Sequence, residues 1–87
     1  MSAAEKKLKA MKDNPQGGWS IKDLHVVAAH WDIEVRNSGG SHYVFSHPGI
    51  EFHLSIPAQR PIKPIYIRHF VKLIDQIKDK QTQQGGE

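Results

Sequence analysis

The stretch Gly39–Gly49 (GGSHYVFSHPG) contains the residues best suited to chemistry. His42 directly follows Gly40 and Ser41, and glycine lets another backbone or a phosphate approach closely. The Ser41 hydroxyl and backbone N–H can donate to a phosphate oxygen. An imidazole that titrates near neutral pH can remove the proton of a ribose 2′-hydroxyl, whose oxygen then attacks the adjacent phosphate. With nearby cations to offset the developing charge, this chemistry needs no metal.

Sequence signals place helices on both sides of this motif. Ser20 and Asp23 form a capping-box pattern, which predicts a helix over 21–30. Pro64 suits the first turn of a last helix, and an apolar stripe extends that helix to about residue 80. The lysine-rich start predicts a short amphipathic helix over 2–12, which must dock or fray. The chain therefore divides into a basic helical arm and linker (1–18), a domain (19–80) and a disordered tail (81–87).

Alternating apolar and polar residues predict three strands, at 31–36, 41–46 and 50–56. The turns between them are short, so the strands are expected to form an antiparallel meander. We therefore expect an α+β fold, a three-stranded antiparallel sheet with two helices on one face, in the order α-β-β-β-α. Double-stranded RNA-binding domains share this order, as do other small α+β proteins.

Composition narrows the class of protein. The chain has 87 residues, enough for one domain, and contains no cysteine, which excludes disulfide scaffolds, thiolate zinc sites and cysteine nucleophiles. A net charge of +3 is compatible with a polyanionic partner. No apolar run is long enough to cross a membrane, and the polar start lacks the pattern of a signal peptide. We therefore expect a cytoplasmic protein that does not act at a membrane.

With these elements in place, the chain resembles the HicA family of toxins, the mRNA interferases of HicA–HicB toxin–antitoxin pairs. The matching residues include Gly40-Ser41-His42, Val44-Phe45, His47-Pro48, Ile56-Pro57 and Pro61-Ile62-Lys63-Pro64, and the match covers about two-thirds of the chain. The resemblance implies a double-stranded-RNA-binding-domain-like fold, ribosome-independent cleavage of mRNA, and neutralisation by a HicB-type antitoxin. It identifies His42 as the catalytic histidine. No cofactor is expected. Family members often carry a histidine after the strand-ending proline, where this chain reads Ala58-Gln59-Arg60. They often carry a basic residue just before Gly-Ser-His, where this chain has Gly39, with Arg36 further back.

Further residues are candidates for binding RNA. Arg60, Lys63 and Arg68 are expected to hold the phosphate backbone beside Gly40 and Ser41, although a solvated charged face is the alternative. His47 is a possible second proton donor, but its place before Pro48 is typical of a turn residue. Tyr43 can stack on a base if its side of the strand is exposed.

Other interpretations of the same residues remain open. His42 can be a strand residue that caps its turn. A zinc site made of His42, His47 and His53 lacks a recognisable ligand spacing, so no metal is expected. A non-catalytic RNA-binding module of the same fold is the main alternative function. The third is a protein-interaction domain that pairs through a sheet edge or its exposed face.

Overall fold

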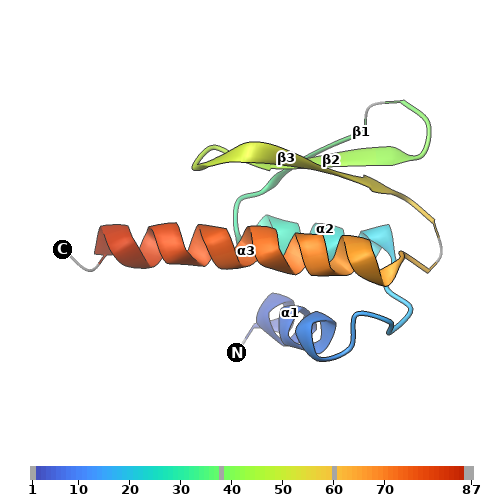
Figure 1. The fold of residues 1–87 in the computed structure, drawn as a ribbon, viewed down its shortest axis with the longest axis horizontal. Coiled ribbons are helices and arrows are strands. Elements are labelled where there is room, and N and C mark those ends of the chain that lie inside the picture. Colours follow the sequence, from blue (N-terminus) through green and yellow to red (C-terminus); the bar gives the residue numbers. More distant parts are fainter. Residues whose placement is uncertain (1, 38, 60, 86–87) are drawn as a thin grey trace.

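The computed structural model describes residues 2–37, 39–59 and 61–85, and of residues 81–85 only the backbone. The elements follow in the order α1 (Ala3–Asp13), α2 (Ile21–His30), β1 (Glu34–Asn37), β2 (His42–His47), β3 (Ile50–Pro57) and α3 (Pro64–Gly85). Figure 1 shows three layers: the sheet, then α2 and α3, then α1 on the side of these helices away from the sheet. The predicted α+β class with a three-stranded antiparallel sheet is confirmed.

The sheet has the order β1-β2-β3, and both of its pairings are antiparallel. On the face of β2 and β3 that packs against the helices, the buried side chains are Phe45, Leu54 and Ile56. Because successive strand residues point to opposite faces, the residues between them form a second face. No element of the described chain covers that second face (Figure 1).

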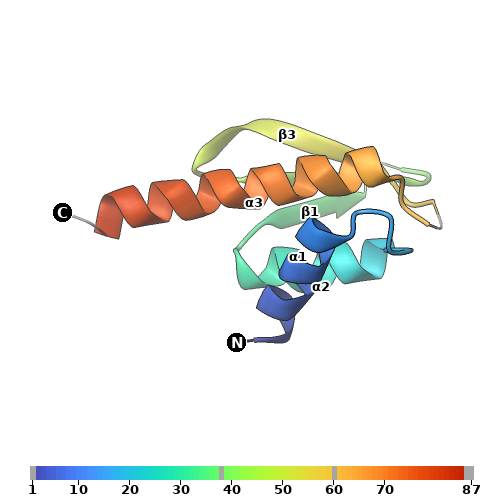
Figure 2. The same ribbon diagram turned by 60° about the horizontal axis from the view of Figure 1, so that its bottom comes forward.

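The core lies between the layers and includes α1. Phe45 of β2 meets Phe70 of α3 edge-on, with 5.5 Å between ring centroids. Leu8 and Met11 of α1 are buried in the same core, and Figure 2 shows α1 lying across α2 and α3. Two ion pairs support this docking: Lys7–Asp23 to α2 at 2.8 Å and Lys12–Asp75 to α3 at 2.9 Å. The basic arm is therefore a packed third layer.

The first strand begins later than the sequence predicts. Trp31 and Ile33 are buried as their alternation suggests, but they lie in the turn that directly follows α2. Asp32 has a φ of 58°, and the Ile33 N–H donates to the Ala28 carbonyl at 3.0 Å, which closes the helix. A left-handed residue that ends a helix produces the same short alternation as a strand. The prediction of a strand from residue 31 was therefore wrong, and β1 starts at Glu34.

The last helix is longer than predicted. It runs to Gly85, so the predicted disordered tail over 81–87 is wrong as far as residue 85, and residues 86–87 lie outside the described residues. Residues 81–84 (QTQQ) contain neither proline nor glycine, so nothing in them stops a helix before Gly85. Among the residues described, no helix has both the length and the apolar character that a membrane crossing requires.

Candidate functional site

The turn before His42 is shaped by two glycines in the left-handed region. The angle φ is 91° at Gly39 and 78° at Gly40, values that residues with a side chain rarely adopt. The Gly39 N–H donates to Oδ1 of Asn37 at 2.9 Å, and the Asn37 amide donates to the Gly40 carbonyl at 3.3 Å. A Cβ on either glycine would meet no atom of the described residues within 4 Å. The glycines therefore serve the backbone path, and the space beside the turn is open to a ligand.

His42, the first residue of β2, lies on the uncovered side of the sheet. Its neighbour Tyr43 is half-buried on the helix side, where its ring meets the ring of His25 edge-on at 5.7 Å between centroids. Alternation along the strand therefore turns the exposed imidazole of His42 to solvent. Within the described chain, none of the side-chain hydrogen bonds or ion pairs involves His42. As far as the described residues extend, both ring nitrogens are open to a substrate.

Backbone contacts hold His42 in place. His42 pairs with Pro57 of β3, and the Ala58 N–H donates to the Ser41 carbonyl at 2.6 Å. These contacts fasten the start of β2 to the end of β3. An imidazole that no described side chain engages can accept the hydrogen bond of a substrate hydroxyl, as a general base must.

The residues that share this uncovered side of the sheet, here named the open face, come from all three strands. Arg36 of β1 lies opposite Val44, and Ser55 of β3 lies opposite Val44 from the other side. Both are therefore diagonal neighbours of His42, about 7–8 Å away between Cα atoms. The open face includes Glu34, Arg36, His42, Val44, Ser46, His53, Ser55 and Pro57.

Arg36 is a site residue that was not among the predicted phosphate contacts. It precedes His42 by six residues, and only the pairing of β1 with β2 brings the two side chains together. The signal that could have found it is the hairpin register, which the predicted turn at 37–40 fixes to within a residue or two. Its Nε donates to Oε1 of Glu34 at 3.1 Å, and the two side chains are 72% and 58% exposed.

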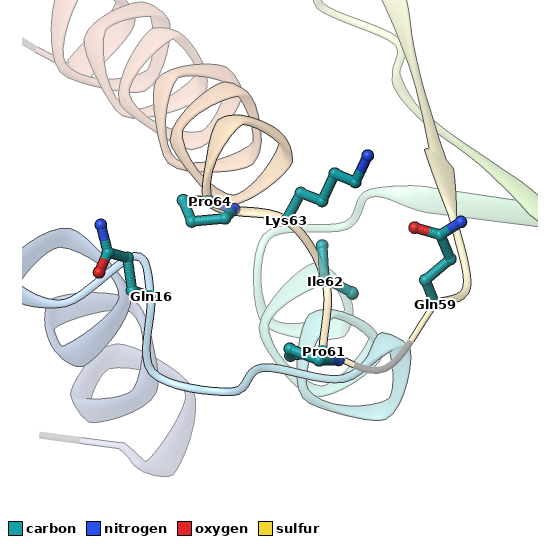
Figure 3. A pocket seen from close by; sticks show the side chains of 6 residues that line it. All are labelled: Gln16, Gln59, Pro61, Ile62, Lys63 and Pro64. Carbon is teal, nitrogen blue, oxygen red and sulfur yellow. The ribbon is translucent and has the colours of Figure 1, made fainter.

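The loop before α3 lies at the same end of the molecule as the β1–β2 turn (Figure 1). This loop borders a shallow hollow of about 770 Å³. Figure 3 shows the side chains of Lys63 and Gln59 extending between the start of α3 and the end of β3. The loop is pinned by Ile62, which is buried and whose N–H donates to the Trp19 carbonyl at 2.8 Å. Lys63 thus stands at a helix N-terminus, where unpaired N–H groups also favour an anion. Arg60, predicted to bind RNA here, lies outside the described residues.

The structure places Arg68 on a different side of the molecule from His42. Arg68 lines a groove with Met11 and Pro15, beside α1. Because α1 lies on the far side of the middle layer from the sheet, this groove and the open face are on different sides of the molecule (Figures 1 and 2). One bound phosphate cannot contact both Arg68 and His42.

The other histidines of the hairpins lie at the far end of β2. His47 is five residues from His42, about 17 Å along a strand. Its Nδ1 accepts a hydrogen bond from the Gly49 N–H at 2.9 Å, which ties the ring to the turn. His53 borders a shallow hollow with His47 and Glu34. In the parts of the chain that the structure describes, no three potential ligand side chains are grouped to hold a metal ion.

Comparisons of the chain with models of protein families, with curated proteins and with solved structures found no significant match. A functional interpretation therefore rests on the motif around His42 and on the geometry of the open face.

Proposed function

We propose that the protein is a HicA-type endoribonuclease toxin with a double-stranded-RNA-binding-domain-like fold, which cleaves mRNA in the cytoplasm. The observation that carries the proposal is the exposed His42, held by backbone contacts at the start of β2 beside an open glycine turn. The resemblance of Gly40-Ser41-His42 and of the segments after it to the HicA family supports the same activity.

In the proposed reaction, His42 acts as the general base. A ring nitrogen takes the proton of a ribose 2′-hydroxyl, and the 2′-oxygen forms a bond to the adjacent phosphorus. The bond from phosphorus to the 5′-oxygen breaks, and that oxygen takes a proton from water. The protonated His42 then gives its proton to the hydroxide that remains, which restores the base. The products are a 2′,3′-cyclic phosphate and a free 5′-hydroxyl. The backbone N–H groups of Gly40 and Ser41, with Lys63 at the start of α3, would hold the phosphate.

This activity implies a partner that restrains it. We propose a HicB-type antitoxin as that partner and flexible or single-stranded mRNA as the substrate. His42 is exposed on the open face. A protein that covers this face would therefore prevent RNA from reaching the base.

The test is cleavage of a labelled mRNA in EDTA by the wild type, by His42→Ala and by His53→Ala. His53 is a matched control, because it is also an exposed histidine on the open face but lies at the other end of the strands. We expect His42→Ala to lose activity by about 100-fold or more, and His53→Ala to retain it. The products should end in 2′,3′-cyclic phosphate. Equal cleavage by a folded His42→Ala protein would refute the role of His42.

A non-catalytic RNA-binding module is the second candidate. The described register positions around His42 hold Pro57, Arg36 and Ser55, none of which is a second histidine or a carboxylate. A site with one base and no neighbouring acid favours binding over catalysis. This candidate predicts that the wild type binds RNA in a gel shift and yields no products.

A further inference from the structure

We infer that Arg36 is the cation that contacts the scissile phosphate at this site, with Glu34 as the residue that positions it. The inference rests on the proposed function, since it names a substrate contact for that same reaction. It concerns the only arginine that the described structure places on the open face, diagonal to His42 across the β1–β2 hairpin.

The spacing between the two side chains suits a phosphate. Diagonal partners on one face of a sheet are about 7–8 Å apart, which leaves room for a phosphate group between the imidazole and the guanidinium. Both side chains are exposed, so neither must leave the core to reach it. Lys63 lies in the loop before α3, whereas Arg36 belongs to a strand that pairs with the strand of His42.

The contact with Glu34 leaves the useful part of Arg36 free. Glu34 accepts from Nε at 3.1 Å, so the two terminal nitrogens keep their donors for another acceptor. An arginine can then bind two phosphate oxygens through parallel hydrogen bonds, a geometry that lysine cannot reproduce. Glu34 restrains the guanidinium from one side and lies farther from the phosphate, opposite Ser46.

Attack by the 2′-oxygen increases negative charge on the non-bridging phosphate oxygens. A guanidinium already in place stabilises that charge more strongly in the transition state than in the bound substrate. The proton still passes from the 2′-hydroxyl to His42, and Arg36 keeps its own protons throughout. Its loss should therefore reduce kcat more than it raises KM.

The experiment measures kcat and KM for RNA cleavage by Arg36→Ala, Arg36→Lys and Lys9→Ala. Lys9 is exposed on α1, so Lys9→Ala removes one positive charge from the far side of the molecule. We expect Arg36→Ala to reduce kcat about 100-fold, Arg36→Lys to recover only part of it, and Lys9→Ala to match the wild type. Wild-type kcat in folded Arg36→Ala would overturn the inference and leave the role of His42 intact.

A second measurement separates this inference from the proposed cleavage. Binding to an oligonucleotide with 2′-O-methyl riboses, which cannot be cleaved, is followed against salt concentration. We expect Arg36→Ala to reduce the slope of log Kd against log salt by about 0.7, the value for one lost phosphate contact. If the wild type binds but does not cleave, the cleavage proposal fails, and this slope still decides whether Arg36 contacts phosphate. An unchanged slope, or no RNA binding by the wild type, overturns the inference.

The role of Glu34 is tested by Glu34→Ala and Glu34→Gln. We expect Glu34→Ala to lower kcat without weakening RNA binding, because it removes a negative charge as well as a restraint. Glu34→Gln should restore kcat, since its amide oxygen can still accept from Nε. Equal kcat in both variants and the wild type would show that Glu34 does not position Arg36.

Discussion

The imidazole of His42 depends on its backbone for its position, because no side chain of the described residues holds the ring. Its geometry is therefore set by the hairpin turn on one side and by the bond from Ala58 to Ser41 on the other. Substitutions in the turn should act on the site through the path of the chain rather than through lost contacts.

Gly40→Ala tests this dependence. The left-handed φ of 78° costs a residue with a Cβ about 1 kcal/mol, and the added Cβ meets no described atom within 4 Å. We expect the variant to fold, with its free energy of unfolding in urea lowered by about 1 kcal/mol. Gly40→Asn should lose less, because asparagine enters this region more readily. A loss of several kcal/mol in Gly40→Ala would show that the turn is packed more tightly than the structure indicates.

At this scale the sequence predicted part of the site. The types and order of Gly40, Ser41 and His42 suggest the chemistry without any structure. The faces of the sheet could not be predicted, since Tyr43 and His42 alternate and either could have been buried. The separation of Arg68 from His42 depends on where α1 docks, and helical spacing in α3 carries no information about that.

Among the elements, α2 has the clearest signals at its start. Asp23 accepts from the Ser20 N–H at 2.9 Å and from Lys7 of α1 at 2.8 Å. Partial burial acts to raise the pKa of the Asp23 carboxyl, but the hydrogen bonds from Lys7 and Ser20 outweigh it, and the pKa lies below its usual value. The same carboxylate thus caps one helix and fastens a second one to it.

The lowered pKa sets the direction of a pH effect. The unfolded chain binds a proton at Asp23 more readily than the folded chain, so this contribution to stability is present above about pH 4, the unfolded pKa, and is lost as pH falls through the folded pKa. We expect Asp23→Asn to unfold more easily than the wild type at pH 7, by about 0.5–1 kcal/mol. The difference should vanish in strong acid. Urea unfolding at several pH values checks this, and a difference independent of pH would contradict it.

The start of α2 and its capping residues were predictable from local signals, whereas the end of α2 was not. A buried Trp31 and Ile33 fit both a strand and a helix end, and only the left-handed Asp32 distinguishes them. The length of α3 was underestimated because the run of polar residues at 81–84 is typical of a disordered tail. None of these residues breaks a helix.

Across the whole molecule, α1 adds a third layer to the sheet and its two helices. Its apolar residues are as buried as those of the sheet, and Met11 has no exposed surface. The spacing of Leu8 and Met11 predicted an apolar side on this helix. It could not show that α2 and α3 together offer a surface to receive it.

Met11→Ala measures how much α1 contributes to the stability of the whole molecule. We expect it to lower the free energy of unfolding by about 2–5 kcal/mol, as for a buried methionine, while the exposed Lys9→Ala changes it by less than about 0.5 kcal/mol. Unfolding followed by tryptophan fluorescence and by far-UV circular dichroism should coincide, because the layers unfold together. Separate transitions, or a negligible effect of Met11→Ala, would show that α1 is an independent arm.

The three layers also determine how the protein can be attached to a solid support. The start of α1 lies on the far side of the helices from the open face, and the end of α3 projects at the opposite end from the β1–β2 turn (Figure 1). A tether at either point leaves the open face directed toward the solution. The protein can therefore be immobilised on a biosensor in a known orientation, with His42 and Arg36 still accessible to RNA in the flow.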